Sequence, residues 1–306
     1  MANCISPITL KGKNGLPPHS VPCGRCHRCL INKKDSWAFR IWQEWKHANT
    51  ANFITLTYDN ESVPLTDQGI LTLDKQALHQ YIKKLKKRND YLLSTKYIDL
   101  NANDWRLRHF ACGEYGEEYG RPHYHILLFN LLPDIIPKLG YIWKEGTTQI
   151  EENMGLGAIE YVSKYMIKRE IDKDDESKTK PFTITSRNPY IGHQYEKESN
   201  KKWHLENRSL RVTNMNGKHM TLPRIYREKW FKYRPEKGGD LEYKPGQKLI
   251  LDILQSETSE KALIKSKKQR EKWINEGLNP EKMEIEAIER EIHNINNLKT
   301  YKHEHF

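Results

Sequence analysis

Long apolar runs are missing from this sequence. No stretch approaches the roughly 20 apolar residues that a membrane-spanning helix needs, and the mean hydropathy is −0.86. The first residues also lack the apolar core of a signal peptide. We therefore expect a cytosolic protein that has no membrane partner.

A nucleotide-binding loop of the form G-x-x-x-x-G-K-[ST] is also absent, so we expect no P-loop ATPase activity. Acidic residues are in the minority, since 40 Asp and Glu stand against 51 Lys and Arg and give a formal net charge of +11. A basic balance suits a polyanionic partner such as nucleic acid. It is only supporting information, because many basic proteins bind no nucleic acid.

Cysteines are few, but four of the five fall within the first 29 residues. Cys23, Cys26 and Cys29 form two successive C-x-x-C steps, and Cys4 lies upstream. In a reducing cytosol this spacing indicates metal binding rather than disulfides. Four thiolates suit a structural zinc site. An iron–sulfur cluster and a set of reduced thiols stay open as alternatives.

A short strand with two histidines is the first catalytic candidate. Residues 122–129 are rich in β-formers, and His123 and His125 fall on one face of that strand because side chains alternate. Residues 109–114 form a second predicted strand, joined to the first by a glycine-flanked loop. We expect Glu114 at its end to come within reach of both imidazoles and to complete a metal site.

A predicted helix over residues 157–169 carries the second candidate. Tyr161, Lys164, Tyr165 and Lys168 fall at i, i+3, i+4 and i+7, so they share one face, opposite an apolar stripe. Alone, such a face is usually solvated, and a lone His-x-His strand is more often structural. The three pieces together, in this order, are more specific.

In that order and spacing the sequence resembles the HUH endonuclease superfamily of rolling-circle replication initiators and relaxases. The resemblance rests on His123 and His125, on Glu114, and on the tyrosine pair Tyr161 and Tyr165. The Phe-Ile-Thr-Leu-Thr-Tyr segment at 53–58 and the Cys-rich start look closest to the initiators of gokushovirus-type microviruses. Tyr124 departs from the pattern, because the superfamily usually has an aliphatic residue between the two histidines.

The resemblance implies an α+β fold: an HUH endonuclease-like central antiparallel sheet with flanking helices, a Cys-rich N-terminal segment and a mostly helical C-terminal region. We expect the helices on one face of the sheet. It implies Mg²⁺ or Mn²⁺ on Glu114, His123 and His125, with Zn²⁺ as a structural ion on the cysteines. Tyr161 and Tyr165 would both act as nucleophiles, assisted by Lys164 and Lys168.

The implied function is to nick one strand of DNA at a phage origin through a 5′-phosphotyrosine and so to start rolling-circle replication in the bacterial cytoplasm. Single-stranded origin DNA is the expected partner, and a host helicase and polymerase are further candidates. A plasmid-type initiator, relaxase or transposase is the nearest alternative. A zinc hydrolase with two histidines and one glutamate, and a non-enzymatic nucleic-acid-binding module, are the rivals from other classes.

Three regions are expected along the chain: a Cys-rich segment with a helix at 1–49, the endonuclease domain at 50–170, and a basic linker with a helical C-terminal region at 171–306. Within them we predict helices at 36–47 and 74–88 and a strand at 53–58. Residues 170–207 are predicted to be a linker or loop. Charged helices are predicted at 249–275 and 280–298.

Overall fold

The computed structural model describes residues 4, 8–10, 19–116, 119–171, 177–207, 209–231, 264, 267–280, 282, 283 and 286. The chain divides into two compact units. A central unit comprises Ala38–Gln194, and a terminal unit comprises Met1–Trp37 together with Tyr195–Phe306. Among the described residues, no helix combines the length and the apolar character needed to cross a membrane.

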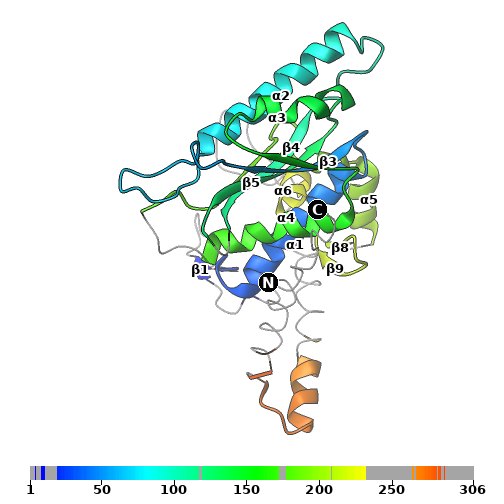
Figure 1. Ribbon diagram of the computed structural model, residues 1–306. Coiled ribbons are helices and arrows are strands. Elements are labelled where there is room, and N and C mark those ends of the chain that lie inside the picture. Colours follow the sequence, from blue (N-terminus) through cyan, green and yellow to red (C-terminus); the bar gives the residue numbers. More distant parts are fainter. Residues whose placement is uncertain are drawn as a thin grey trace. The chain divides into compact units, whose positions relative to one another are not determined.

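The central unit is built on a five-stranded antiparallel sheet (Figure 1). Its strand order is β6 (Thr148–Glu152), β3 (Ala51–Thr57), β5 (Pro122–Phe129), β4 (Arg108–Tyr115) and β7 (Phe182–Thr185). The two strands predicted to carry the metal ligands, β4 and β5, are neighbours within this sheet. The predicted α+β class and the antiparallel sheet are therefore confirmed.

Strand β7 lies in the segment over 170–207 for which the composition predicts a loop, so that prediction is wrong. Residues Phe182–Thr185 pair with β4, with Phe182 opposite Gly113 and Thr185 opposite Phe110. The strand is only four residues long and its flanks are polar, which explains why composition suggests a loop. Helix α5 (Glu198–Glu206) occupies a further part of the same segment.

One face of the sheet packs against α2 (Lys75–Thr95), which begins as predicted at Asp74. The Asp74 carboxylate accepts hydrogen bonds from the backbone N–H groups of Gln76 (2.7 Å) and Ala77 (3.0 Å), an N-cap. The core on this side joins α2 to alternate residues of β3 and β5; its members include Ile54, Leu56, Leu78, Tyr81, Leu85, Tyr124, Ile126 and Leu128.

The phenol of Tyr124 explains why this position departs from the usual aliphatic residue. Its hydroxyl lies 2.8 Å from the Tyr58 hydroxyl, donates to the Asp74 carbonyl (2.8 Å) and accepts from the Asp74 N–H (3.0 Å). A fully buried hydroxyl needs such partners. Tyr124 therefore links β5 to the start of α2.

The opposite face of the sheet is covered by α4 (Leu156–Ile171), which carries the two tyrosines. Side chains alternate along β3, so Phe53 points away from the α2 side, and its ring lies 5.9 Å from that of Tyr161. The placement of α2, α3 (Leu139–Ile142) and α4 on two sides of the sheet is visible in Figure 1. The expectation that all helices lie on one face is therefore wrong.

Helix α1 (His27–Trp45) begins before the predicted start at Ser36. The sequence from 27 to 35 is polar overall, which hides the helix, yet Leu30 and Ile31 are buried. This earlier start places Cys29 in the first turn of α1. The boundary between the two compact units falls within this helix.

The terminal unit holds two small antiparallel pairs, β1 (Ile8–Leu10) with β2 (His19–Val21) and β8 (Arg211–Thr213) with β9 (His219–Thr221). It also holds α6 (Arg224–Phe231). Residues 267–275 are helical, as predicted. Most of the predicted helices at 249–275 and 280–298 lies outside the described residues.

Candidate active site

The pairing of β4 and β5 brings the three predicted metal ligands together. Glu114 is paired directly with His123, and Cys112 with His125. His123 and His125 are two residues apart on one strand, so both point to the face covered by α4. The carboxylate at the end of β4 therefore meets both imidazoles.

The distances among these side chains suit a shared cation. Oε1 of Glu114 lies 2.9 Å from Nε2 of His123 and 3.0 Å from Nε2 of His125. Adjacent ligands of an octahedral cation with bonds of about 2.1 Å lie about 3.0 Å apart. The three side chains thus present one oxygen and two nitrogens at the spacing of a coordination sphere.

The other ring nitrogens of the two histidines are also engaged. Nδ1 of His123 donates to the Arg121 carbonyl (3.2 Å), and Nδ1 of His125 lies 3.1 Å from the Thr55 hydroxyl. Metal-bound histidines show this arrangement, because a partner at one nitrogen orients the other toward the ion. His123 faces an acceptor at both nitrogens, a conflict for a neutral ring that a cation at Nε2 would remove.

Burial and hydrogen bonding set the charges of this cluster. Burial alone would raise the pKa of Glu114, but the hydrogen bonds from His123 and His125 outweigh it and hold that pKa well below the usual range. Burial lowers the pKa of His125, chiefly by disfavouring the imidazolium. An ionised carboxylate beside a neutral imidazole is the state in which these groups bind metal.

Both predicted tyrosines reach this cluster, but in different ways. The Tyr161 hydroxyl lies 3.4 Å from Nε2 of His125, and its side chain is half-buried. Tyr165 is only 6% exposed, and its ring stacks on that of His125 with centroids 5.5 Å apart. Burial raises the pKa of Tyr165, and the charge of Glu114 adds to the effect. The two phenols therefore differ in access.

Lys164 lies over the phenol rings rather than beside their hydroxyls. Its Nζ is 4.1 Å from the centroid of Tyr161 and 5.5 Å from that of Tyr165. An ammonium in this position interacts with the ring quadrupole and places a positive charge near the site. The side chain of Lys168, the other predicted lysine, lies outside the described residues.

Sequence reasoning assigns no role to Thr55, which holds His125 through its hydroxyl, or to Phe53, which stacks on the same imidazole at 5.5 Å. The alternation of β3 already puts both side chains on one face. What it cannot give is the register between β3 and β5, which sets Thr55 opposite His125.

The four N-terminal cysteines form a second cluster in the terminal unit. One sulfur from each of Cys4, Cys23, Cys26 and Cys29 lies within 4.8 Å of the others. Backbone hydrogen bonds from Arg25 and Cys26 lower the pKa of Cys23 to about 6, whereas burial raises that of Cys29. No disulfide joins any of these four residues.

Comparison with known proteins agrees with this arrangement. Residues 51–170 match the family model of the replication-associated protein ORF2. Replication-associated protein VP4 of Bdellovibrio phage phiMH2K is 28% identical over 239 residues, which are 72% of this chain and 71% of that protein. Replication-associated protein ORF2 of Spiroplasma virus 4 is 26% identical over 230 residues, 70% of this chain and 68% of its own.

Replication-associated protein ORF4 of Chlamydia phage 1 is 26% identical over 168 residues, 49% of this chain and 38% of that protein. Among solved structures, the nuclease domain of the minute virus of mice non-structural protein 1 covers 61% of this chain at 12% identity, but a TM-score of 0.20 carries no argument. The family match and the three phage relatives place this chain among the phage replication-associated proteins of the ORF2 family.

Proposed function

We propose that this protein starts phage DNA replication by cutting one DNA strand at the origin and later rejoining it, with a tyrosine as nucleophile. The observation that carries the proposal is the Tyr161 hydroxyl, 3.4 Å from Nε2 of a histidine whose neighbours are Glu114 and His123. A nucleophile beside a cation site is the arrangement that phosphoryl transfer needs.

In the proposed step, Oη of Tyr161 attacks a backbone phosphorus of single-stranded DNA. A bond forms between the phenol oxygen and phosphorus, the bond from phosphorus to the 3′ oxygen breaks, and the phenol proton ends on the leaving 3′-OH. The product is a 5′-phosphotyrosine and a free 3′-OH. Attack by a 3′-OH on the phosphotyrosine reverses the step and joins the strand.

The cluster of Glu114, His123 and His125 would hold the divalent cation, which polarises the scissile phosphate and stabilises the charge that develops on it. A site of mixed imidazole and carboxylate ligands accepts Mg²⁺ or Mn²⁺, and the usual affinity order favours Mn²⁺. The carboxylate and the Nδ1 partners of both histidines keep the two Nε2 atoms directed at one point. Lys164 would balance phosphate charge above the phenol rings.

The difference in access suggests an order for the two tyrosines. Tyr161 is half-buried and its hydroxyl already faces His125, so it is the proposed nucleophile of the first cut. Tyr165 lies one helical turn further, with its ring 5.4 Å from that of Tyr161. It would make the second transfer, after the first phosphotyrosine has drawn Tyr161 away from His125. The same protein could then end one round and begin another.

A covalent adduct on a denaturing gel tests the proposal. Wild-type protein with Mn²⁺ and a labelled single-stranded origin oligonucleotide should give a protein band that carries the DNA downstream of the cut, joined through its 5′ phosphate. The double variant Tyr161→Phe/Tyr165→Phe should give none. Tyr141→Phe is the matched control, because Tyr141 is 81% exposed on α3. Cleavage without an adduct would support a metal hydrolase instead.

The proposed partner is single-stranded origin DNA, bound through a chain whose net charge is +11. A host helicase and polymerase would extend the free 3′-OH, and the bacterial cytoplasm is the proposed location. The superfamily alternatives, a plasmid initiator, relaxase or transposase, would use the same chemistry. The phage relatives favour the phage origin.

A further inference from the structure

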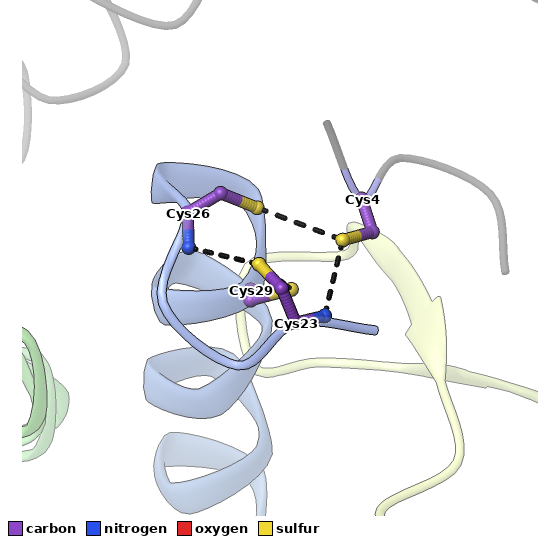
Figure 2. A group of neighbouring side chains, drawn as sticks. All are labelled: Cys4, Cys23, Cys26 and Cys29. Carbon is purple, nitrogen blue, oxygen red and sulfur yellow. Dashed lines mark hydrogen bonds between the residues drawn. The ribbon is translucent and has the colours of Figure 1, made fainter. Parts of the chain in front are cut away.

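The four-cysteine cluster is built from three separate pieces of the terminal unit. Cys4 comes from the N-terminal segment, Cys23 and Cys26 flank the turn before α1, and Cys29 lies in the first turn of that helix. Figure 2 shows the side chains of Cys4, Cys23 and Cys26 turned toward one another, with Cys29 behind Cys23. The proposed nuclease chemistry uses none of these residues.

The sulfur separations suit one metal ion and no disulfide. Sγ of Cys4 lies 3.9 Å from that of Cys26, and Sγ of Cys23 lies 4.0 Å from that of Cys29. A disulfide would bring two sulfurs to about 2.05 Å. Four thiolates bound to one tetrahedral zinc with bonds of about 2.3 Å lie about 3.8 Å apart. A four-iron cluster binds each thiolate to a different iron and would spread the sulfurs further.

The backbone around these sulfurs is arranged as in a metal-binding turn. The N–H groups of Arg25 (3.5 Å) and Cys26 (3.3 Å) donate to Sγ of Cys23, and the N–H of Cys23 donates to Sγ of Cys4 (3.2 Å). Gly24 has φ +77°, a conformation that glycine adopts without a steric penalty. N–H groups directed at sulfur stabilise thiolate over thiol, which a metal ligand requires.

From this geometry we propose that Cys4, Cys23, Cys26 and Cys29 bind one Zn²⁺ in a structural site. Binding forms four zinc–sulfur bonds and releases the thiol protons to solvent. All four positions of the ion are then filled by protein, so the site is closed to substrate. Its effect is to join residue 4 and the turn before α1 to the first turn of that helix. The inference does not depend on the proposed nuclease activity.

Metal analysis of the full chain tests the site, provided that zinc at the histidine cluster is removed from the measurement. The test is therefore made in a His125→Ala background. Purified protein should contain about one zinc per chain, and adding Cys26→Ser should abolish it. Cys112→Ala is the matched control, because Cys112 is a buried free cysteine in β4, and it should keep the zinc.

Cobalt substitution and thiol labelling report on wild-type protein, in case Cys26→Ser fails to fold. Cobalt should give the intense visible bands and sulfur-to-metal charge transfer of a tetrahedral thiolate site. Alkylation of the native thiols should become fast only after zinc is chelated. Equal alkylation rates with and without chelator, a single bound iron in place of zinc, or zinc retained in Cys26→Ser would each overturn the proposal. None of these readouts depends on DNA cleavage.

Discussion

His125 is contacted on both faces and at both nitrogens of its ring. Phe53 and Tyr165 stack on the ring, Thr55 holds Nδ1, and Glu114 and Tyr161 lie near Nε2. Such a ring has one orientation available. A ligand that is fixed in this way loses little freedom when it binds an ion, which strengthens binding.

Thr55 is therefore predicted to control metal affinity without touching the ion. Thr55→Ala removes the partner of Nδ1 and should weaken Mn²⁺ binding roughly 10–100-fold, the usual effect of losing such a partner. Isothermal titration with Mn²⁺ measures it, and DNA cleavage should need correspondingly more Mn²⁺. Thr55→Ser keeps the hydroxyl and should restore binding. Equal affinities for the alanine and serine variants would contradict this role.

The two tyrosines are predicted to differ when they are removed singly. Tyr161→Phe should sharply reduce the initial rate of adduct formation, because the accessible hydroxyl near His125 is lost. Tyr165→Phe should keep most of that rate and fail in repeated rounds on a circular template. Peptide mapping of the early adduct should find DNA on Tyr161. An early adduct on Tyr165 alone would reverse the proposed order.

At the scale of the element, the loop before β6 approaches the end of β3 very closely. A Cβ atom at Gly146 would lie 2.3 Å from the Thr57 carbonyl oxygen and 2.6 Å from the Asp59 nitrogen. Backbone atoms cannot yield as a flexible side chain can. The loop is bonded to β3 there, since the N–H of Thr57 donates to the Thr147 carbonyl (3.0 Å).

Gly146→Ala is therefore predicted to destabilise the central unit by more than the ~1 kcal/mol of a typical substitution, and to loosen the pairing of β3 with β6. Gly140→Ala is the control, because a Cβ there meets nothing within 4 Å in helix α3. Alanine in place of glycine within a helix usually stabilises by roughly 0.5–1 kcal/mol. Urea denaturation of the two variants measures both effects. Equal free energies of unfolding would show that the loop can move.

Elements with a strong local pattern could be predicted, and those that depend on packing could not. The bounds 122–129 of β5 agree with the prediction, since β-formers fill the segment and turn residues end it. Strand β7 escapes prediction, because it is ordered by pairing with β4 and not by its own four residues. The meeting of Glu114 with the two histidines follows from a short loop and alternation. The burial of Tyr165 does not, because it depends on how α4 lies against the sheet.

For the whole molecule, a buried histidine outside the metal cluster predicts acid sensitivity. His109 is 6% exposed, and Nδ1 of its ring lies 3.0 Å from the Ser186 hydroxyl. Burial, with smaller effects from Lys86 and Arg108, lowers the pKa of His109 to about 3. The unfolded chain binds this proton near pH 6.5. Stability that is complete above about pH 6.5 is therefore lost as the pH falls toward about 3.

The free energy of unfolding should accordingly decrease with falling pH in this window, with a slope of up to about 1.4 kcal/mol per pH unit from His109. His109→Asn offers a polar atom to Ser186 but no titrating ring, so its slope should be shallower. Urea titrations at several pH values measure the difference. His219→Asn is the control, because His219 is exposed on β9, and it should keep the wild-type slope. A wild-type slope in His109→Asn would refute the assignment.

The phenol of Tyr124 lies between the two ligand histidines in sequence and on the other side of the sheet in space. Its hydroxyl fixes the backbone of β5 to Tyr58 and to the start of α2. The strand that carries His123 and His125 is thus anchored from the face opposite the candidate active site. The site is preorganised: the entropy that its ligands would lose on binding an ion is lost when the protein folds. A phenylalanine at this position would keep every ligand and still give a looser metal site.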